Sequence, residues 1–293
     1  MNQIKVFRPV NLSLILLVSI VFGSLGGSFS EICSQSDYGA SILSLTYGGL
    51  AMLVAAGGYL INDVYDLKID EINHPNKKLP FSVKSARTIY AIINAIVVVV
   101  SLLFFEWEFS LLFFILPIWL LWLYSFLLKR WAIIGNLVVS FLALLLPLGV
   151  FLLFADEQYL KDNHSIKMQF VLLLLAASFL STFSREIIKD IQDVKGDEAN
   201  NCKTFPILVG KEFAAIFAAF ILLILLLVWG NFGLKNINDF PLITQVTLLL
   251  TEILLLGALI ALFVGKQWES KTKWSSLLIK LAMLVALVTG LLY

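Results

Sequence analysis

Two groups of three aspartates in this chain share one spacing. In each group the second aspartate follows the first by three residues, and the third follows the second by four. Residues spaced in this way lie on one face of a helix, so the carboxylates of each group can converge. Converging carboxylates repel one another unless cations neutralise them, and Mg²⁺ is bound by a few carboxylates together with substrate phosphate oxygens. The expected metal ligands are Asp63, Asp66, Asp70, Asp190, Asp193 and Asp197.

Lysines follow both aspartate groups at a similar distance. Lys77 in the first half of the chain and Lys203 in the second each precede a proline by three residues. Together with Lys78 and Lys189, they can complete a diphosphate clamp as point charges. A single acidic group at a helix end is commonly only solvated, but two matching groups favour a site. The repeated pattern predicts an internal repeat with one site-forming loop in each half.

The composition excludes a soluble domain. Of the 293 residues, 60% are hydrophobic and 14% are charged, and the mean hydropathy is +0.93. No soluble core requires so much apolar surface, so we predict an all-α protein that crosses a membrane several times. Cys33 and Cys202 lack a metal-binding spacing, and no disulfide is expected between them. The first apolar segment lacks a clear cleavage site, so we interpret it as a retained helix.

Nine apolar segments have a length near the ~20 residues that span a bilayer. They are, approximately, residues 10–28, 41–62, 87–105, 109–127, 133–154, 168–185, 212–230, 241–264 and 274–292. This predicts a single integral-membrane domain over residues 1–293. Its two motif-bearing halves, about 1–130 and 131–293, are expected to surround a central cavity.

Basic residues set the expected orientation of these helices. With the N-terminus in the cytoplasm, most lysines and arginines fall on the cytoplasmic side, including those beside both aspartate groups. The opposite side then holds only Lys161, Lys167 and Lys235. We therefore predict a multi-pass protein of the cell (inner) membrane, with the N-terminus and both aspartate motifs in the cytoplasm.

The motifs around the aspartates resemble those of the UbiA superfamily of intramembrane prenyltransferases. The family motif N-D-x-x-D-x-x-x-D is matched from Asn62 to Asp70, and D-x-x-x-D is matched by Asp193 and Asp197. The expected helices and the order of the motifs agree with the family over the whole chain. The run Arg8-Pro9-Val10-Asn11 is similar to the R-P-x-N motif at its first helix.

Another stretch is similar to the end of the family's fourth helix. It runs from Tyr124 to Lys129-Arg130 and is followed by Gly135-Asn136. The chain departs from the family after the first motif, where His74 and lysines stand in place of the usual arginine.

The resemblance implies a reaction between an allylic isoprenyl diphosphate and a lipophilic acceptor. The donor diphosphate would bind two Mg²⁺ ions held by the aspartates, and its allylic carbon would become cation-like before the acceptor attacks it. Water must be excluded, so the lipid tail is expected in a hydrophobic tunnel. The implied catalytic residues are Asp66, Asp70, Asp193, Asp197 and Tyr124. The implied substrate-binding residues are Arg8, Asn11, Asn62, Lys77, Lys78, Lys129, Arg130, Arg185, Lys189 and Lys203.

The second motif resembles one branch of the family in more detail. The stretch from Arg185 to Asp197, with Thr204-Phe205-Pro206-Ile207 after it, is similar to the pattern R-E-x-x-K-D-I-x-D-x-x-G-D…T-x-P-I. That branch prenylates geranylgeranylglyceryl phosphate, so the resemblance implies this acceptor with geranylgeranyl diphosphate as donor. An aromatic acceptor, as in quinone, haem O or pigment biosynthesis, and a UbiA-like terpene cyclase remain open as alternatives.

Two other classes of membrane protein fit the sequence less well. The D-G-x-x-A-R…G-x-x-x-D-x-x-x-D pattern of CDP-alcohol phosphotransferases is absent. Secondary transporters usually place ionisable groups near the bilayer midplane in broken helices, whereas these acids lie at helix ends beside basic loops. The expected partners are the diphosphate donor, the acceptor and membrane lipids, with no nucleic acid.

Overall fold

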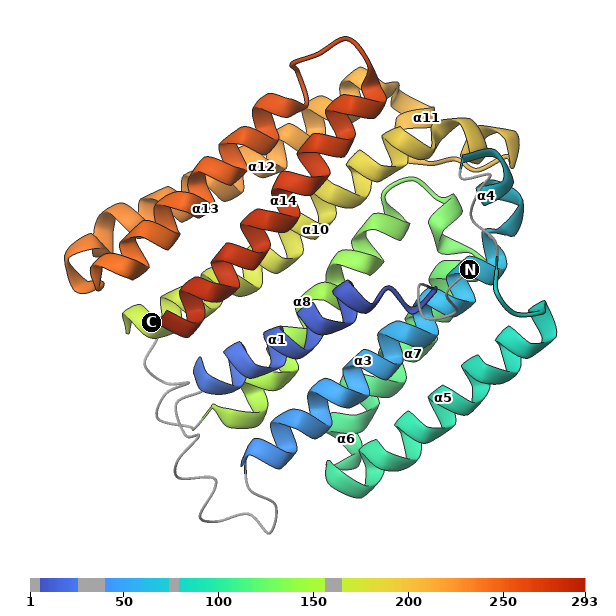
Figure 1. Ribbon diagram of the computed structural model, residues 1–293, viewed down its shortest axis with the longest axis horizontal. Coiled ribbons are helices and arrows are strands. Elements are labelled where there is room, and N and C mark those ends of the chain that lie inside the picture. The colour runs from blue at the N-terminus through green and yellow to red at the C-terminus, as the bar shows by residue number, and fades with distance from the viewer. Residues whose placement is uncertain (1–5, 26–39, 74–78, 156–164, 293) are drawn as a thin grey trace.

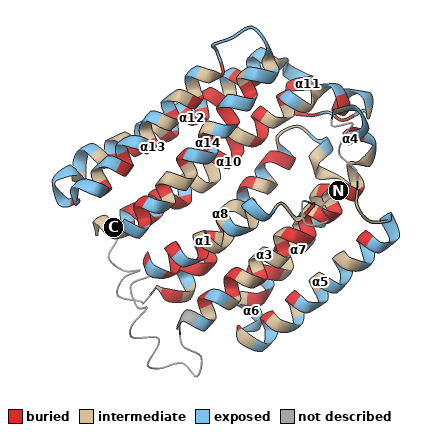
Figure 2. Ribbon diagram, in the orientation of Figure 1, coloured by how far each residue is buried: buried red, intermediate tan, exposed pale blue. Residues whose placement is uncertain are grey.

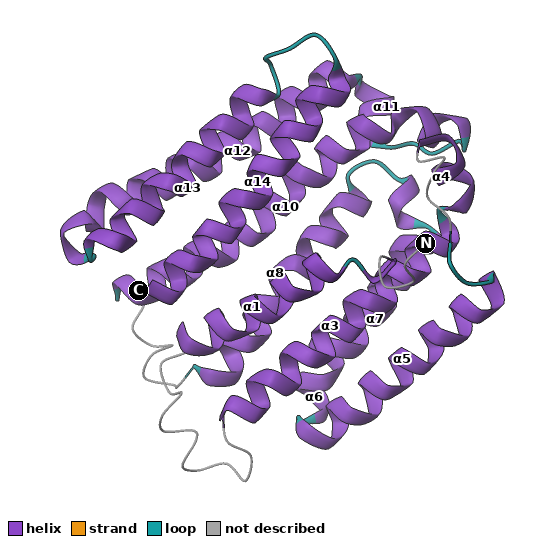
Figure 3. Cartoon of the chain, viewed as in Figure 1, coloured by secondary structure: helices purple, strands orange, loops and turns teal. Residues whose placement is uncertain are grey.

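The structure, a computed structural model, describes residues 6–25, 40–73, 79–155 and 165–292. Within these ranges the chain is helical and contains no β-strand, apart from one isolated bridge between Trp131 and Lys203 (Figure 3). The prediction of an all-α fold is confirmed. The principal helices are α1 (Pro9–Leu25), α3 (Ala40–Tyr65), α4 (Leu67–Asn73), α5 (Val83–Phe104), α6 (Trp107–Ser110), α7 (Leu116–Phe126), α8 (Ile134–Phe154), α10 (Ile166–Ala199), α11 (Phe205–Val209), α12 (Lys211–Asn236), α13 (Leu242–Ala261) and α14 (Trp268–Leu292).

Eight helical stretches in the described ranges are long and apolar enough to cross a membrane. They are Ile42–Tyr65, Val83–Phe104, Trp107–Phe126, Ile134–Phe154, Ile166–Ala199, Lys211–Asp239, Leu242–Ala261 and Trp268–Leu292. The stretch Trp107–Phe126 combines α6, a π-helical segment (Leu111–Ile115) and α7. The ninth expected span corresponds to α1, which has 17 described residues and borders residues outside the described ranges. Nine spans therefore remain a prediction.

The helices that carry the two aspartate groups lie in the middle of separate parts of the bundle (Figure 1). Helix α3 packs against α1, α5 and α7, whereas α10 packs against α8, α12 and α14. Helices α1 and α8 contact each other and connect these parts, because α1 also packs against α14. The short helices α4 and α11 lie at the same end of the bundle (Figure 1). The fold therefore brings the ends of α3 and α10 to one side.

The two larger of three buried clusters fill most of the interior of the bundle. The first core cluster includes Phe22, Tyr47, Phe114, Phe154 and Trp229. The second core cluster includes Ile187, Ile191, Ala218, Leu222 and Ile279.

The outward helix faces are exposed (Figure 2), and many of the exposed residues are large and apolar. On α12 the exposed Phe213, Ile216 and Phe220 lie on one helix face, as expected for contact with lipid tails. In the most apolar part of each helix, half of the residues of α10 are buried, against 11% of those of α5. Helix α10 is therefore central and α5 peripheral. Since lipid tails are as apolar as leucine, helix association depends mainly on close packing.

Helix α10 is longer than the sequence patterns predicted. We expected a span over 168–185 followed by a site-forming loop, but α10 has 34 residues and carries the second aspartate group within it. At 1.5 Å per residue it is about 51 Å long, so it must project beyond a hydrocarbon core of ~30 Å. The charged residues of its last turns therefore need not leave the helix to reach water.

The end of α10 is fixed by its backbone. Asn201 adopts a left-handed conformation (φ 56°). The amide of Cys202 donates to the carbonyl of Asp197 (2.9 Å), and the amide of Asn201 donates to that of Glu198 (3.1 Å). This is the Schellman arrangement that commonly ends a helix. It turns the chain toward Lys203 directly after the second aspartate group.

Candidate active site

The aspartates of both groups lie on helices or in the tight turn between two helices. Asp63 is in the last turn of α3, Asp66 lies in the turn before α4, and Asp70 is within α4. The second group occupies the end of α10. Because α4 packs against α10, the two groups face each other. Asp197 accordingly interacts electrostatically with both Asp193 and Asp66.

Asp66 is held from two sides by hydrogen bonds. The ammonium of Lys129 donates to Oδ1 in a short ion pair, and Nδ2 of Asn62 donates to Oδ2 (2.6 Å). The Lys129 side chain is only 9% exposed. Lys129, which the resemblance implied as a substrate-binding residue, thus forms an ion pair with this aspartate. Removing either member of such a buried pair would leave a charge without compensation.

The first aspartate of each group binds a structural partner. Asp63 is 4% exposed and accepts a hydrogen bond from Nη2 of Arg8 (3.2 Å). Asp190 accepts one from Nδ2 of Asn136 (2.8 Å). These contacts tie the ends of α1 and α8 to the two motif-bearing helices. Asp190 also interacts electrostatically with Asp193 and Asp197. That all six carboxylates bind metal stays a prediction.

The start of α1 is further braced by α3. The guanidinium of Arg8 lies 4.5 Å from the centre of the Tyr59 ring, and Nδ2 of Asn11 donates to the Tyr59 hydroxyl (3.3 Å). A cation over an aromatic face contributes ~0.5–2 kcal/mol. Both residues were expected to bind substrate, and here they position the beginning of the first helix.

The loops that follow α7 and α10 are joined to each other. The amide of Lys203 donates to the carbonyl of Arg130 (2.8 Å), beside the isolated bridge between Trp131 and Lys203. The side chains of Arg130 and Lys203 are both exposed. This pairing places two predicted phosphate-binding residues next to each other at the same end of the bundle.

Gly135 allows α8 to approach the residues before it closely. A Cβ atom at this position would lie 2.9 Å from Cα of Lys129 and 3.3 Å from the ring of Tyr124. The contact with Lys129 is closer than a Cβ atom tolerates, so the glycine sets the position of Lys129 against α8. Tyr124 in turn interacts electrostatically with the carboxylates of Glu186 and Asp66.

The donor set suits Mg²⁺ in its chemistry. Asp197 is repelled electrostatically by both Asp193 and Asp66, and among the described residues the buried Oδ1 atom of Asn62 accepts no hydrogen bond. Excess acceptor oxygens of this kind are what a hard, oxygen-binding cation compensates. Within the described ranges, however, no three carboxylate, histidine or cysteine side chains are arranged closely enough to hold a metal ion. Substrate phosphate oxygens would then have to complete the coordination.

Arg185 and Lys189 contact Glu186, a carboxylate that is not among the expected metal ligands. Nη1 of Arg185 donates to Oε1 of Glu186 (3.2 Å), and the Lys189 ammonium makes a short ion pair with the same oxygen. Glu186 is buried. From the sequence alone, Glu186 had no assigned role beyond its place in the R-E-x-x-K-D pattern. The other expected phosphate ligands Lys77 and Lys78 lie outside the described residues.

Asn73 is a site residue that the sequence patterns missed. Its Nδ2 donates to the carbonyl of Asp193 (3.0 Å), and its Oδ1 accepts from the amide of Gly196 (2.9 Å). A Cβ atom on Gly196 would lie 2.4 Å from Nδ2 of Asn73. The amide thus inserts where α10 lacks a side chain and fixes α4 against α10. The one available signal was Gly196 inside a charged helical segment, where a glycine lowers helix stability.

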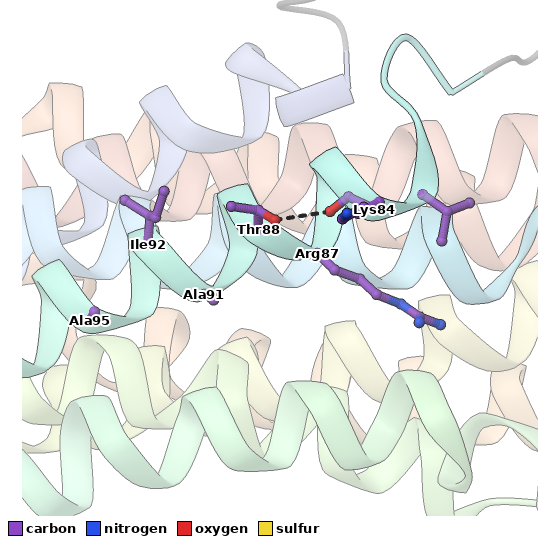
Figure 4. A pocket seen from close by; sticks show the side chains of 7 residues that line it. Lys84, Arg87, Thr88, Ala91, Ile92 and Ala95 are labelled. Atoms are coloured by element: carbon purple, nitrogen blue, oxygen red, sulfur yellow. Dashed lines mark hydrogen bonds between the residues drawn. The ribbon is translucent and has the colours of Figure 1, made fainter.

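A shallow hollow on the outer side of α5 is separate from this site (Figure 4). It is lined by Val83, Lys84, Arg87, Thr88, Ala91, Ile92 and Ala95. The Thr88 hydroxyl donates to the Lys84 carbonyl within the helix (3.1 Å). The lining contains no carboxylate, so this hollow lacks the groups expected to bind metal.

Comparisons with known proteins agree with the geometry. The model of the UbiA prenyltransferase family matches residues 14–289. Digeranylgeranylglyceryl phosphate synthase of Methanosphaera stadtmanae is 28% identical over 288 residues, which cover 98% of this chain and 96% of the relative. A solved structure of a digeranylgeranylglyceryl phosphate synthase is 25% identical, with a TM-score of 0.65 over 99% of this chain and 98% of that one. A UbiA homologue from Archaeoglobus fulgidus bound to DMAPP and Mg²⁺ is 16% identical, with a TM-score of 0.68 over 99% and 98% of the two chains.

The Asn73 contact predicts a specific loss of stability. Gly196→Ala and Asn73→Ala should each lower the free energy of unfolding by about 1–3 kcal/mol, because each leaves buried polar groups without partners. The double variant should lose little more than either single variant, since both remove one contact. Thermal unfolding in detergent, followed by circular dichroism, measures these effects. Gly49→Ala is the matched control, because a Cβ there meets nothing within 4 Å. Additive losses in the double variant would contradict the contact.

Proposed function

The chain belongs to the UbiA prenyltransferase family, and from this premise we propose that it transfers a geranylgeranyl group to geranylgeranylglyceryl phosphate within the membrane. That it is an integral membrane enzyme which transfers an isoprenyl group follows from the family match and the apolar helices. The observation that carries the choice of acceptor is the likeness, over nearly the whole chain, to a relative named digeranylgeranylglyceryl phosphate synthase. The proposal would not hold if the acceptor were aromatic.

We propose that two parts of the chain supply the carboxylates of the donor site. Asp66 and Asp70 approach from the end of α3 and from α4, while Asp193 and Asp197 approach from α10. These four carboxylates would hold Mg²⁺, with the number of ions proposed as two. When bound there, Mg²⁺ would neutralise the diphosphate and stabilise the charge that develops on it as it leaves.

The basic residues at this end would bind the same diphosphate. The paired loops present the exposed side chains of Arg130 and Lys203, and Lys129 already neutralises Asp66. Such preorganised charges stabilise a leaving anion without reorganising during the reaction. Tyr124 lies among the acidic residues and can turn an aromatic face toward an allylic cation.

The transfer breaks one bond and forms one bond. The C1–O bond of the donor breaks with both electrons on the departing diphosphate, and the free glycerol hydroxyl of the acceptor forms a new C–O bond at C1. The hydroxyl proton is lost to a basic oxygen of the diphosphate or of a carboxylate. The chain must exclude water from C1, because water would give the free alcohol instead. On the basis of the basic residues, we place this site on the cytoplasmic side.

Product analysis tests the acceptor directly. Purified protein in detergent, with Mg²⁺ and geranylgeranyl diphosphate, should convert geranylgeranylglyceryl phosphate into a doubly prenylated glycerol phosphate, detected by mass spectrometry. EDTA should reduce turnover at least ~100-fold because the diphosphate would lose its metal. Prenylation of an aromatic acceptor alone would overturn the choice of acceptor, and a cyclised hydrocarbon formed without acceptor would indicate a cyclase.

Single carboxylate substitutions test the metal assignment. Asp66→Asn and Asp193→Asn should each lower kcat at least ~100-fold, since each removes a charged oxygen ligand at the leaving diphosphate. Asp239→Asn serves as the control, because Asp239 lies in the short turn of residues Ile237–Asp239 after α12. Turnover near that of the unmodified protein in either site variant would refute the role of that aspartate.

The Asp66–Lys129 ion pair predicts an unusual dependence on Mg²⁺. Lys129→Met should lower the melting temperature in metal-free buffer, because Asp66 loses its buried partner. Added Mg²⁺ should raise the melting temperature of this variant more than that of the unmodified protein, because the cation can replace the missing ammonium. Lys235→Met at the end of α12 provides the matched control. An equal Mg²⁺ response in both proteins would show that the metal does not bind at Asp66.

A further inference from the structure

Lys280 lies at the midpoint of α14, a helix long enough to span the membrane. A lysine at the centre of a span costs about 2.5–3.5 kcal/mol on insertion scales, so such residues usually face a polar cavity or a partner. Met283 and Leu287 share its helix face, and they pack against the second and first core clusters, respectively. Lys280 therefore lies on a face of α14 that borders both clusters, and it is exposed, so its ammonium is open to a ligand.

Helix α14 packs against α13, α10 and α1. The charged groups that act on Lys280 belong to α10 and to the start of α1. Lys280 interacts electrostatically with Arg185, Lys189, Arg8 and Glu186. Of these, Arg8 is already paired with Asp63. Of the groups that act on Lys280, Glu186 is the carboxylate, and it contacts both Arg185 and Lys189.

The charges of this group do not balance. Arg185 and Lys189 both donate to the same oxygen of Glu186. Asp190, one turn further along α10 and bound to Asn136, also interacts electrostatically with Glu186. Even with Asp190 ionised, two negative charges face three positive charges when Lys280 is included. Within the described residues, Nε of Arg185 is buried and has no hydrogen-bond partner. The Lys189 side chain is one-third exposed, so its ammonium can still reach a ligand. An excess of cations in a low-dielectric setting favours the binding of an anion.

This basic group is separate from the aspartate site along α10. Glu186 precedes Asp193 by seven residues, which corresponds to about 10 Å along a helix. It lies toward the interior of the span, whereas the aspartates occupy the projecting end. Tyr124 interacts electrostatically both with Glu186 and with Asp66, so it lies near both sites. The carboxylates that would bind the donor metal and the cations that would bind a second anion would thus both lie near Tyr124.

We propose that Arg185, Lys189 and Lys280 bind the phosphate monoester of the lipid acceptor. This rests on the proposed function, since only a phosphorylated acceptor needs such a site. Glu186 would hold Arg185 and Lys189 in place when no acceptor is bound. The acceptor hydroxyl would then lie on the side of Tyr124 opposite the donor diphosphate.

Lys280 is the residue that tests this proposal, because it makes no ion pair that the fold needs among the described residues. The assay compares geranylgeranylglyceryl phosphate with geranylgeranylglycerol, which lacks the phosphate, at saturating geranylgeranyl diphosphate. Lys280→Met should raise KM for the phosphorylated acceptor at least ~10-fold and leave KM for the donor within about twofold. It should have little effect with the unphosphorylated acceptor. Lys280→Arg should restore most of the affinity, because it keeps the charge. Lys273→Met, on the same helix, is the matched control.

A competition assay separates this site from a general effect on the membrane. In phosphatidylcholine nanodiscs, added phosphatidic acid offers another lipid phosphate monoester. It should raise the apparent KM for the acceptor in the unmodified protein and much less in Lys280→Met. Equal competition in both proteins would overturn the proposal.

The failures are distinguishable from one another. If the unmodified protein forms no product with the phosphorylated acceptor, the proposed function itself fails. If it does form product, and Lys280→Met either keeps the same KM or loses activity equally with both acceptors, only the phosphate site is overturned.

Discussion

The hydrogen bonds between the Asn73 amide and the backbone of α10 hold the two acidic motifs in register. Helix α4 has seven residues, too few to be stable alone, so its position depends on tertiary contacts. Asn73 can reach the α10 backbone only because Gly196 has no side chain in its path. That single contact fixes where Asp70 lies relative to Asp193. The ion pair of Lys129 with Asp66 then adds the loop after α7 to the same arrangement.

The burial of charge explains why the first aspartate of each group binds a protein partner. The first aspartate of each group has a comparable structural role, since Asp63 binds Arg8 at the start of α1 and Asp190 binds Asn136 at the start of α8. Each contact anchors a neighbouring helix to a motif-bearing helix. The later aspartates lie toward the projecting end of α10 or on α4, where water and cations have access. A membrane helix tolerates so many charges only because its end extends beyond the hydrocarbon core.

Much of this arrangement followed from the sequence. The hydropathy predicted an all-helical membrane protein because a bilayer allows few other ways to satisfy the backbone. The repeated aspartate spacing identified both acidic motifs, and the fold places them opposite each other. The sequence did not predict that α10 continues through the second motif, because hydropathy marks where apolar residues end and not where a helix ends. The turn that ends α10 depends on the conformation of Asn201.

The sequence by itself determined the residue types: which helices are apolar, where carboxylates recur and which loops are basic. Only the tertiary structure decided the partners. Lys129 pairs with Asp66, Asn73 with Gly196, and Arg185 with Glu186. It also brought Lys280 into electrostatic reach of Arg185 and Glu186, although Lys280 lies far from them along the chain. Local periodicity specifies which side of a helix a residue occupies, but not which helix will lie against that side. That choice is made by packing among distant segments.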